Sequence, residues 1–334
     1  MNVNIVMHPY SLPLICPIHL GGVATSERTG WLVELTGPDG RKGWGEIAPL
    51  PGVSGEEELA TLEAWDSERE EPAEATPSVR CGLDMAFFNL GDPEMLPEPL
   101  RGLAPGQHDL NLSALLIGDV DSMLKQEQVA YREGYRTMKV KVGRKDTGDE
   151  IELLHQLNRH ASDETAFRLD ANQSWSPDEA DRYLSVLTEM DVEFVEEPFA
   201  SARASLAWSE KTGVPVALDE SLRQITPADL ADYAGIRAVV LKPTLLGGLV
   251  RCVEYAAAAR AIGAYPVISS MYESGVGVLT LARFATALCD EETAAGLDTY
   301  RWLARDVLRD RPPVRAGCLR ASAMEWADYR VQLD

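Results

Sequence analysis

Residues 137–143 read TMKVKVG, a short apolar run that carries Lys141 near its end. Four similar runs follow, and each also ends on a charged residue: AFRLD at Asp170, EFVE at Glu196, VALD at Asp219 and VVLK at Lys242. The successive gaps of 29, 26, 23 and 23 residues each fit one strand plus one helix. In a (β/α)8 barrel the carboxyl ends of the strands converge on one mouth. The five charged groups are therefore predicted to meet in one active site.

The pattern around these runs predicts a closed barrel. From residue 109 onward apolar runs alternate with helix-like stretches, and a capping box at Ser176-Pro177-Asp178-Glu179 and an N-cap at Thr226-Pro227 mark helix starts. Eight strands with right-handed crossovers favour a closed barrel over an open sheet. The strands are expected near 109–116, 137–142, 166–170, 193–197, 214–219, 238–242, 266–270 and 294–298.

The first hundred residues have a different sequence pattern from the rest of the chain. Trp31 to Thr36 and Gly43 to Ile47 flank the turn Gly-Pro-Asp-Gly and predict a hairpin, and Val79 to Leu90 has the apolar spacing of a buried helix. We therefore expect an α/β fold: a modified TIM barrel with an N-terminal α+β capping domain. The predicted domains are a capping domain at 1–105, a barrel at 106–305 and a C-terminal segment at 306–334 that returns to the capping domain.

Composition limits the partners. The 53 acidic residues outnumber the 31 Lys and Arg, and the net charge of −22 argues against nucleic acid or an anionic membrane as a partner. The acidic stretch 56–74 is expected to be a solvated face and loop. Five cysteines without a C-x-x-C pair suit a reducing compartment, and we find no basic leader and no apolar run of about 18 residues. A cytoplasmic protein is expected, and no protein partner can be inferred.

Three of the strand-end residues suggest a metal site. Asp170, Glu196 and Asp219 end consecutive strands, and two carboxylates about 4 Å apart repel by roughly 4 kcal/mol even at an effective dielectric of about 20. Oxygen ligands without nearby Cys or His select a hard ion, so Mg²⁺ is expected, with Mn²⁺ as a substitute. Strand alternation leaves open whether Glu196 or Glu197 binds the metal. Asn172 either hydrogen-bonds to the metal shell or serves only a turn.

The two lysines of KVKVG are candidates for proton transfer. Lys139 and Lys141 are two residues apart on one strand, so both face the same side, and the flanking Met138, Val140 and Val142 suit the side that faces the helices. A lysine must lose about three pKa units, roughly 4 kcal/mol, to act as a base near neutral pH. The like charge of Lys139 would lower the pKa of Lys141.

Lys242 is expected to face Lys141 across the barrel, because it ends the sixth strand and Lys141 ends the second. Two lysines on opposite faces of a metal-bound carboxylate suit abstraction of the proton α to that carboxylate, with the metal stabilising an enediolate. The sequence therefore predicts an enzyme whose partner is a small-molecule carboxylate substrate.

These motifs make the chain resemble the o-succinylbenzoate synthases of menaquinone biosynthesis, a family in the mandelate racemase and muconate-lactonising branch of the enolase superfamily. The resemblance implies that Lys141 is the acid/base lysine and that Lys242 lies on the opposite face of the substrate ring. It also implies that Glu196, with Asp170 and Asp219, holds Mg²⁺. It covers nearly the whole chain and rests on these segments: GWGEIAPLPGVS (43–54), KVKVG (139–143), RLDANQSW (168–175), EEPF (196–199), ALDESL (217–222), LKPTLLGGL (241–249), VISSMYESGVG (267–277) and GLDT (296–299).

The resemblance further implies a reaction and a substrate site. The activity would be that of a hydro-lyase: Mg²⁺-dependent syn dehydration of 2-succinyl-6-hydroxy-2,4-cyclohexadiene-1-carboxylate to 2-succinylbenzoate, through a metal-stabilised enediolate. Ser269, Ser270 and Gly296 fall where the family binds the succinyl and carboxylate ends. The PLPG loop at 49–52 would help to close over the substrate.

Related activities are separated by single features. All five histidines precede the third predicted strand, which excludes the His–Asp base of mandelate racemases. The segment at Asp298 lacks the second acid of the Asp-x-Asp found in dipeptide epimerases. N-succinylamino-acid racemases need the same lysines and metal and stay an alternative, although LKPTLLGG favours the synthase. A remote alternative is an inactive barrel acting as a binding protein, but such a barrel is expected to lose a ligand or a lysine, and none is lost.

Overall fold

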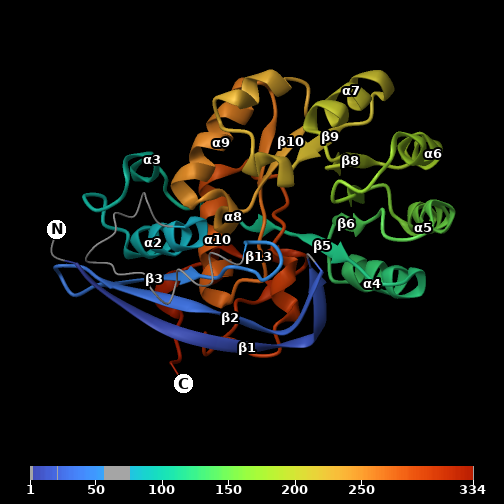
Figure 1. Ribbon diagram of the computed structural model, residues 1–334. Helices are drawn as coiled ribbons and strands as arrows, with labels where there is room; N and C mark the ends of the chain where they lie inside the picture. Colours follow the sequence, from blue (N-terminus) through green and yellow to red (C-terminus); the bar gives the residue numbers. More distant parts are fainter. Residues whose placement is uncertain (1–2, 21, 56–75, 334) are drawn as a thin grey trace.

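The computed structural model describes residues 3–20, 22–55 and 76–333 (Figure 1). The acidic stretch 56–74 lies outside the described residues. The N-terminal unit is an antiparallel sheet of three strands in the order β1-β2-β3, drawn in blue in Figure 1. The strands are β1 (Asn4–Leu20), β2 (Val23–Thr36) and β3 (Lys42–Ile47).

The predicted hairpin and buried helix are confirmed. Thr36 of β2 pairs with Lys42 of β3 across the turn. Helix α2 (Pro77–Leu90) packs against β3. A Cβ atom at Gly45 would lie 1.9 Å from the carbonyl oxygen of Gly82, so glycine at this position allows α2 to lie directly on the strand. The short helix α3 (Glu98–Arg101) leads on to the barrel.

The barrel is built on a parallel sheet whose strands follow chain order from β5 to β11. Seven of the eight predicted strands are confirmed, with the first one split at Leu112 into β4 (Leu110–Asn111) and β5. The strands are β5 (Ser113–Leu116), β6 (Thr137–Lys141), β7 (Ala166–Asp170), β8 (Val192–Glu196), β9 (Val216–Leu218), β10 (Ala238–Leu241) and β11 (Tyr265–Ile268).

The eighth predicted strand, 294–298, closes the ring without forming a strand. Ala295 forms a single bridge with Leu112, and Gly296 forms one with Ser269, so this segment bonds to both ends of the sheet. The prediction of its position is right and that of its conformation is wrong. The backbone leaves the extended conformation at Leu297 (φ −102°, ψ 8°), where the 3-10 helix η3 (Asp298–Trp302) begins.

Helices follow most strands and cover the outside of the sheet (Figure 1). The capping box at Ser176 is confirmed at the start of α6. The cap predicted at Thr226 is present, because the Asp229 amide donates to the Thr226 hydroxyl at 3.3 Å, but the helix that it precedes is a 3-10 helix. The segment between β9 and β10 holds the 3-10 helices η1 (Glu220–Arg223) and η2 (Asp229–Tyr233). The α-helices are α4 (Val120–Arg132), α5 (Thr147–His160), α6 (Pro177–Leu187), α7 (Ala202–Thr212), α8 (Pro243–Leu246), α9 (Leu249–Ala261) and α10 (Gly275–Leu288).

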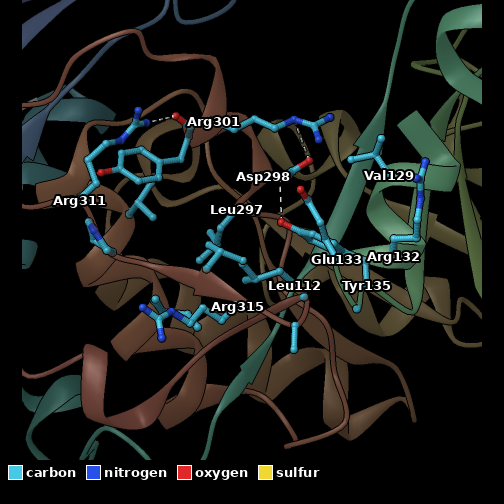
Figure 2. A pocket seen from close by; sticks show the side chains of 18 residues that line it. Leu112, Val129, Arg132, Glu133, Tyr135, Leu297, Asp298, Arg301, Arg311 and Arg315 are labelled. Atoms are coloured by element: carbon cyan, nitrogen blue, oxygen red, sulfur yellow. Dashed lines mark hydrogen bonds and ion pairs between the residues drawn. The ribbon is translucent and has the colours of Figure 1, made fainter. Parts of the chain in front are cut away.

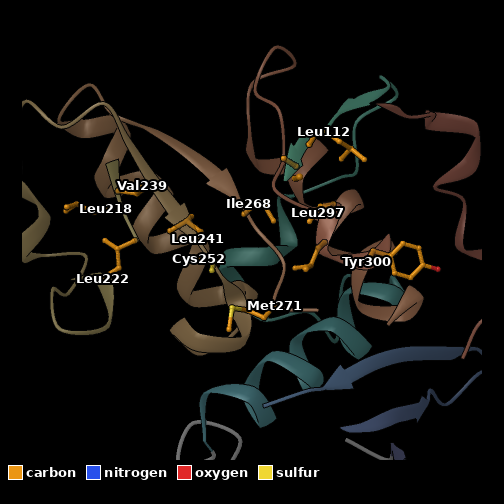
Figure 3. Close-up of a cluster of buried hydrophobic side chains, with 14 of the residues drawn as sticks. Leu112, Leu218, Leu222, Val239, Leu241, Cys252, Ile268, Met271, Leu297 and Tyr300 are labelled. Carbon is orange, nitrogen blue, oxygen red and sulfur yellow. The ribbon is translucent and has the colours of Figure 1, made fainter. Parts of the chain in front are cut away.

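Two layers of apolar side chains fix the strands. The side chains that alternate outward pack beneath the helices, as Figure 3 shows for Leu218, Val239, Leu241 and Ile268 beside Cys252 of α9. The inward-facing layer is small and fills the barrel below the charged residues. It consists of Phe194, Ala217, Ala238, Val240 and Val267.

The C-terminal segment was expected to return to the capping domain. Its strands β12 (Val314–Arg315) and β13 (Cys318–Leu319) pair with β4, and a bridge to the capping strand β1 lies just before the segment, between Leu14 and Leu303. The return of the whole segment to the capping domain stays a prediction. The short turns η4 (Ala321–Ala323) and η5 (Trp326–Asp328) follow. The domain boundaries themselves stay a prediction. Among the described residues, no helix combines the length and apolar character needed to cross a membrane.

One carboxylate joins the two domains. Glu46, at the end of β3, is fully buried and accepts hydrogen bonds from the backbone amides of Ser274 and Gly277, both at 2.9 Å, and from the Ser274 hydroxyl at 2.6 Å. The Tyr10 hydroxyl also donates to it. The first amides of a helix have no hydrogen-bond partner within the helix. Glu46 therefore supplies, from the other domain, the acceptor for the amides at the start of α10.

Candidate active site

Three carboxylates lie side by side at the carboxyl ends of neighbouring strands, as predicted. Asp170 on β7 is the register partner of Glu196 on β8, and Asp219 directly follows β9. Their exposed fractions are 0%, 1% and 4%, so all three negative groups are withdrawn from water. Such a cluster is stable only with compensating positive charge.

The two lysines of β6 supply part of that charge and point into the barrel. Lys139 Nζ lies 2.8 Å from Asp170 Oδ2 and 2.6 Å from Glu196 Oε2. Lys141 Nζ lies 2.5 Å from Asp170 Oδ2 and 2.9 Å from Asn172 Oδ1. The residues that alternate with them, Met138 and Val140, are fully buried on the opposite side. The prediction that both lysines face inward is confirmed.

Lys242 approaches the cluster from the other side, directly after β10, and forms an ion pair with Asp219. Burial opposes its charged form, but the nearby carboxylates of Asp219, Glu196 and Glu220 outweigh burial and raise its pKa. The pKa of Lys141 moves the other way. Burial lowers it, the charge of Lys139 lowers it further, and Asp170 opposes both.

The carboxylates of Glu196 and Asp170 differ in pKa. Burial raises the pKa of Glu196 to about 8, and the negative charge of Asp170 adds to the rise. Burial also opposes the ionised form of Asp170, but the Lys139 and Lys141 ammonium groups outweigh it and hold the pKa of Asp170 below its usual range. Glu196 is therefore the member of the cluster with the least compensated charge.

The structure separates the two adjacent glutamates that strand alternation left open. Glu196 faces the cluster, whereas Glu197 turns away and accepts hydrogen bonds at 2.8 Å from the amides of Asp219 and Ser221 and from the Ser221 hydroxyl. Glu197 directly follows the end of β8 and has a positive φ of 44°. Glu197 thus holds the backbone that carries Asp219 in place.

The donor set suits a hard divalent ion. One ammonium nitrogen, that of Lys139, contacts both Asp170 and Glu196, so their oxygens already converge on one point. Carboxylate oxygens of this kind are the ligands that Mg²⁺ takes in proteins. Within the described chain, no three His, Cys, Asp or Glu side chains are yet arranged around one metal position. In this structure the Lys139 ammonium stands between the carboxylates.

Asn172 does more than serve a turn. Its side-chain oxygen accepts a hydrogen bond from Lys141, and its side-chain nitrogen donates to Glu220 Oε1 at 2.8 Å. Its φ of 45° is the left-handed conformation that asparagine tolerates better than most residues. Asn172 therefore positions the Lys141 ammonium relative to the carboxylates.

The residues predicted to bind substrate line the same cavity from the opposite wall. The hydroxyls of Ser269 and Ser270 donate to the Gly296 carbonyl oxygen at 3.2 and 3.1 Å. The cavity has a volume of about 310 Å³, which suits a small organic molecule. Lys139, Lys141 and Lys242 also face it.

The N-terminal loop reaches this cavity, as expected for a loop that closes over a substrate. Leu50 and Val53 line it. Arg28, with an exposed fraction of 1%, donates hydrogen bonds to the carbonyl oxygens of Ala48 and Pro49 and, at 3.1 Å, to that of Tyr272. One buried guanidinium thus joins the loop to the rim of the barrel.

The sequence analysis missed several residues of the cavity wall. Arg144 lines it from the turn after β6, and His19 lines it from the capping strand β1. Arg144 was detectable, because it follows KVKVG at the carboxyl end of a barrel strand. His19 was not, because its place depends on how the capping domain packs. The other missed polar residues are Ser113, Glu220, Tyr272, Asp298 and Thr299.

Two family models match the chain. One, described as enolase C-terminal domain-like, covers residues 122–324, and the other, described as MenC, N-terminal domain, covers residues 3–90. The o-succinylbenzoate synthase of Klebsiella pneumoniae (strain 342) is 33% identical over 329 residues, which cover 96% of this chain and 98% of that relative.

Solved structures of related enzymes share the fold. The muconate lactonizing enzyme from Pseudomonas fluorescens superposes with a TM-score of 0.80 at 20% identity, over 99% of this chain and 96% of that one. The dipeptide epimerase from Methylococcus capsulatus, solved in complex with Mg and a dipeptide, gives a TM-score of 0.77 at 26% identity, over 96% of this chain and 97% of that one.

Proposed function

The chain belongs to the o-succinylbenzoate synthase family of the enolase superfamily, and from that premise we propose that it dehydrates 2-succinyl-6-hydroxy-2,4-cyclohexadiene-1-carboxylate to 2-succinylbenzoate. This is a hydro-lyase reaction of menaquinone biosynthesis in a cytoplasmic enzyme. The observation that carries the proposal is geometric: Lys141 and Lys242 line one cavity, and each is paired with a different carboxylate, Asp170 for Lys141 and Asp219 for Lys242.

Asp170, Glu196 and Asp219 would hold Mg²⁺, and Mn²⁺ would substitute. Their oxygens provide the donor set, and Lys139 neutralises the part of their charge that one divalent ion leaves over. Mg²⁺, when bound there, supplies Lewis-acid stabilisation of the negative charge that develops on the substrate carboxylate.

The proton transfers fall to Lys141. As the free amine it removes the ring proton α to the carboxylate, and the electron pair left on the ring expels the 6-hydroxyl group. Lys141, now protonated, returns that proton to the departing hydroxyl, and water leaves. Both transfers occur on one face of the ring, which makes the elimination syn. Asn172 holds the amine in place throughout.

Lys242 stays a cation. Its raised pKa and its ion pair with Asp219 make it a poor base but a fixed positive charge near the opposite face of the ring. Ser269, Ser270 and Gly296 are proposed to hold the succinyl and carboxylate ends of the substrate, since they form the facing wall.

N-succinylamino-acid racemisation is the second candidate, because both lysines reach the same cavity and a racemase needs one on each face. An ultraviolet assay for the aromatic product, run beside a racemisation assay on an N-succinylamino acid, separates the two. Dehydration well above racemisation supports the synthase. Racemisation without dehydration would overturn it.

A further inference from the structure

A second cavity, larger than the catalytic one, lies on the other side of Asp298. Its volume is about 850 Å³, within the usual range of small-molecule sites. The end of α4, the turn after it, η3 and the C-terminal segment form its walls (Figure 2). Asp298 is the one residue that lines both cavities.

The charge of this cavity is opposite to that of the chain. Four of its lining residues are arginines: Arg132, Arg301, Arg311 and Arg315. They face two acids, Glu133 and Asp298, in a protein whose net charge is −22. A concave basic surface in so acidic a chain concentrates small anions.

The acid at the centre of the cavity is already satisfied. Asp298 accepts a hydrogen bond at 2.8 Å from the backbone amide of Leu115, lies within 3.4 Å of the Tyr135 hydroxyl and forms an ion pair with Arg301 at 3.3 Å (Figure 2). The negative charge of Asp298 is therefore compensated by these neighbours. Asp298 does not neutralise the other three arginines of the cavity.

The guanidinium of Arg311 is held in position by neutral groups. It donates to the carbonyl oxygens of Leu303 at 3.0 Å and Tyr300 at 2.8 Å, and it lies 4.4 Å over the Tyr300 ring. Arg132 donates to the Gln128 carbonyl oxygen at 2.9 Å. Carboxylate partners within 4 Å are absent for Arg132, Arg311 and Arg315 across the described ranges 3–20, 22–55 and 76–333.

The rest of the wall is apolar. Leu112, Val129 and Leu297 line the cavity together with the arginines (Figure 2), and Val314 is a further apolar lining residue. An inorganic anion would gain nothing from these side chains, whereas an organic anion would bury its carbon skeleton against them. The combination selects a molecule with an apolar body and more than one acidic group.

We propose that the cavity between Arg132, Arg301, Arg311 and Arg315 binds a small organic dianion, of the class of aromatic or alicyclic dicarboxylates, at a site separate from the catalytic pocket. The anion would lie between Arg311 and Arg315 on one wall and Arg132 on the other, with Arg301 beside it. This inference does not depend on the proposed dehydration.

The test is calorimetric titration of the Mg²⁺-loaded full chain with phthalate. Arg315→Glu reverses one charge without breaking a described hydrogen bond and is expected to weaken phthalate binding at least about tenfold, since a charge-assisted hydrogen bond is lost. Arg305→Glu is the matched control. Arg305 is exposed and lies outside the lining set, so its reversal changes the net charge equally and should leave the dissociation constant within about twofold.

Two further titrations locate the ligand and define its class. Arg144→Glu, in the catalytic pocket, should leave phthalate binding unchanged, and inorganic phosphate should bind at least about tenfold more weakly than phthalate because it lacks the apolar body. Absence of binding at millimolar phthalate, equal binding by wild type and Arg315→Glu, or loss of binding in Arg144→Glu instead would overturn the site. Equal affinity for phosphate would overturn the assignment of an organic ligand.

Discussion

Lys141 and Lys242 are both buried ammonium groups at the mouth of one barrel, yet their pKa values move in opposite directions. Lys141 shares its carboxylate partner, Asp170, with a second lysine. Lys242 has Asp219 as its partner, with three further carboxylates nearby, those of Glu196, Glu220 and Asp170. The two lysines therefore differ in their charged surroundings, which fits the proposed proton transfer by Lys141 and the proposed fixed charge at Lys242.

The first prediction compares these lysines. Lys141→Ala should lower kcat by about 10⁴ or more, because one residue serves both proton transfers and a single positioned acid/base group contributes about 10² to 10⁴. Lys242→Arg keeps a cation and should retain measurable dehydration. Steady-state kinetics with the cyclohexadiene substrate give the comparison. An equal collapse of the two variants would favour the racemase, in which both lysines must exchange protons.

The second prediction concerns the metal. EDTA should abolish activity, Mg²⁺ or Mn²⁺ should restore it, and Zn²⁺ should be a poor substitute for this all-oxygen donor set. Asp219→Asn should weaken Mg²⁺ binding by at least about tenfold without unfolding the chain, while Glu220→Gln, one residue later, should have a smaller effect. Full activity in a metal-free preparation would refute the site.

The third prediction concerns Arg144. It lines the catalytic cavity and has no carboxylate partner among the described ion pairs, so we expect it to bind the distal carboxylate of the substrate. Arg144→Gln should raise KM about tenfold or more with a smaller change in kcat, because the contact exists before and during the reaction. Lys145→Gln removes the neighbouring exposed cation and should leave KM near its original value. A KM for Arg144→Gln within twofold of the wild type's would exclude the contact.

The fourth prediction concerns stability and pH. Burial raises the pKa of Asp84 to about 6, although the carboxylate accepts a hydrogen bond at 3.0 Å from Val250 in the first turn of α9. A raised carboxyl pKa means that the folded chain binds this proton more tightly than the unfolded chain, so its contribution to stability is lost as the pH rises from about 4 to about 6. The loss should be about 2 to 3 kcal/mol.

Urea unfolding at about pH 4.5 and about pH 7 checks this, with Asp84→Asn as the comparison. The asparagine cannot ionise, so the variant should lose less stability between the two pH values than the wild type does. Identical losses in both proteins would mean that the Asp84 carboxyl titrates normally.

Sequence alone predicted the elements whose signal is local. The interval from Lys141 to Lys242 placed the strands, and the alternation around Lys139 placed its side chain inside the barrel. The choice between Glu196 and Glu197 stayed open, because alternation says only that the two neighbours face opposite sides and not which of them faces the other carboxylates. The conformation of 294–298 was also missed, since an apolar run cannot show that its chain turns at Leu297.

Site residues whose position depends on how the capping domain packs were the hardest to predict from the sequence. His19 reaches the catalytic cavity only because β1 crosses its rim, and nothing near it in the sequence distinguishes it from a surface histidine. The second cavity was missed for a related reason: its arginines come from α4, η3 and the C-terminal segment, which only the fold brings together.

The hydrogen bonds from α10 to Glu46 bear on how such enzymes diversify. The first amides of α10, in the barrel, are hydrogen-bonded by a residue of the capping domain. A capping domain taken from a relative without an acceptor at the position of Glu46 would leave the amides of Ser274 and Gly277 buried and unpaired. Exchange of either domain alone is thus expected to destabilise the chain. Changes of substrate are expected to arise through the loops of the existing cap rather than through recombination of whole domains.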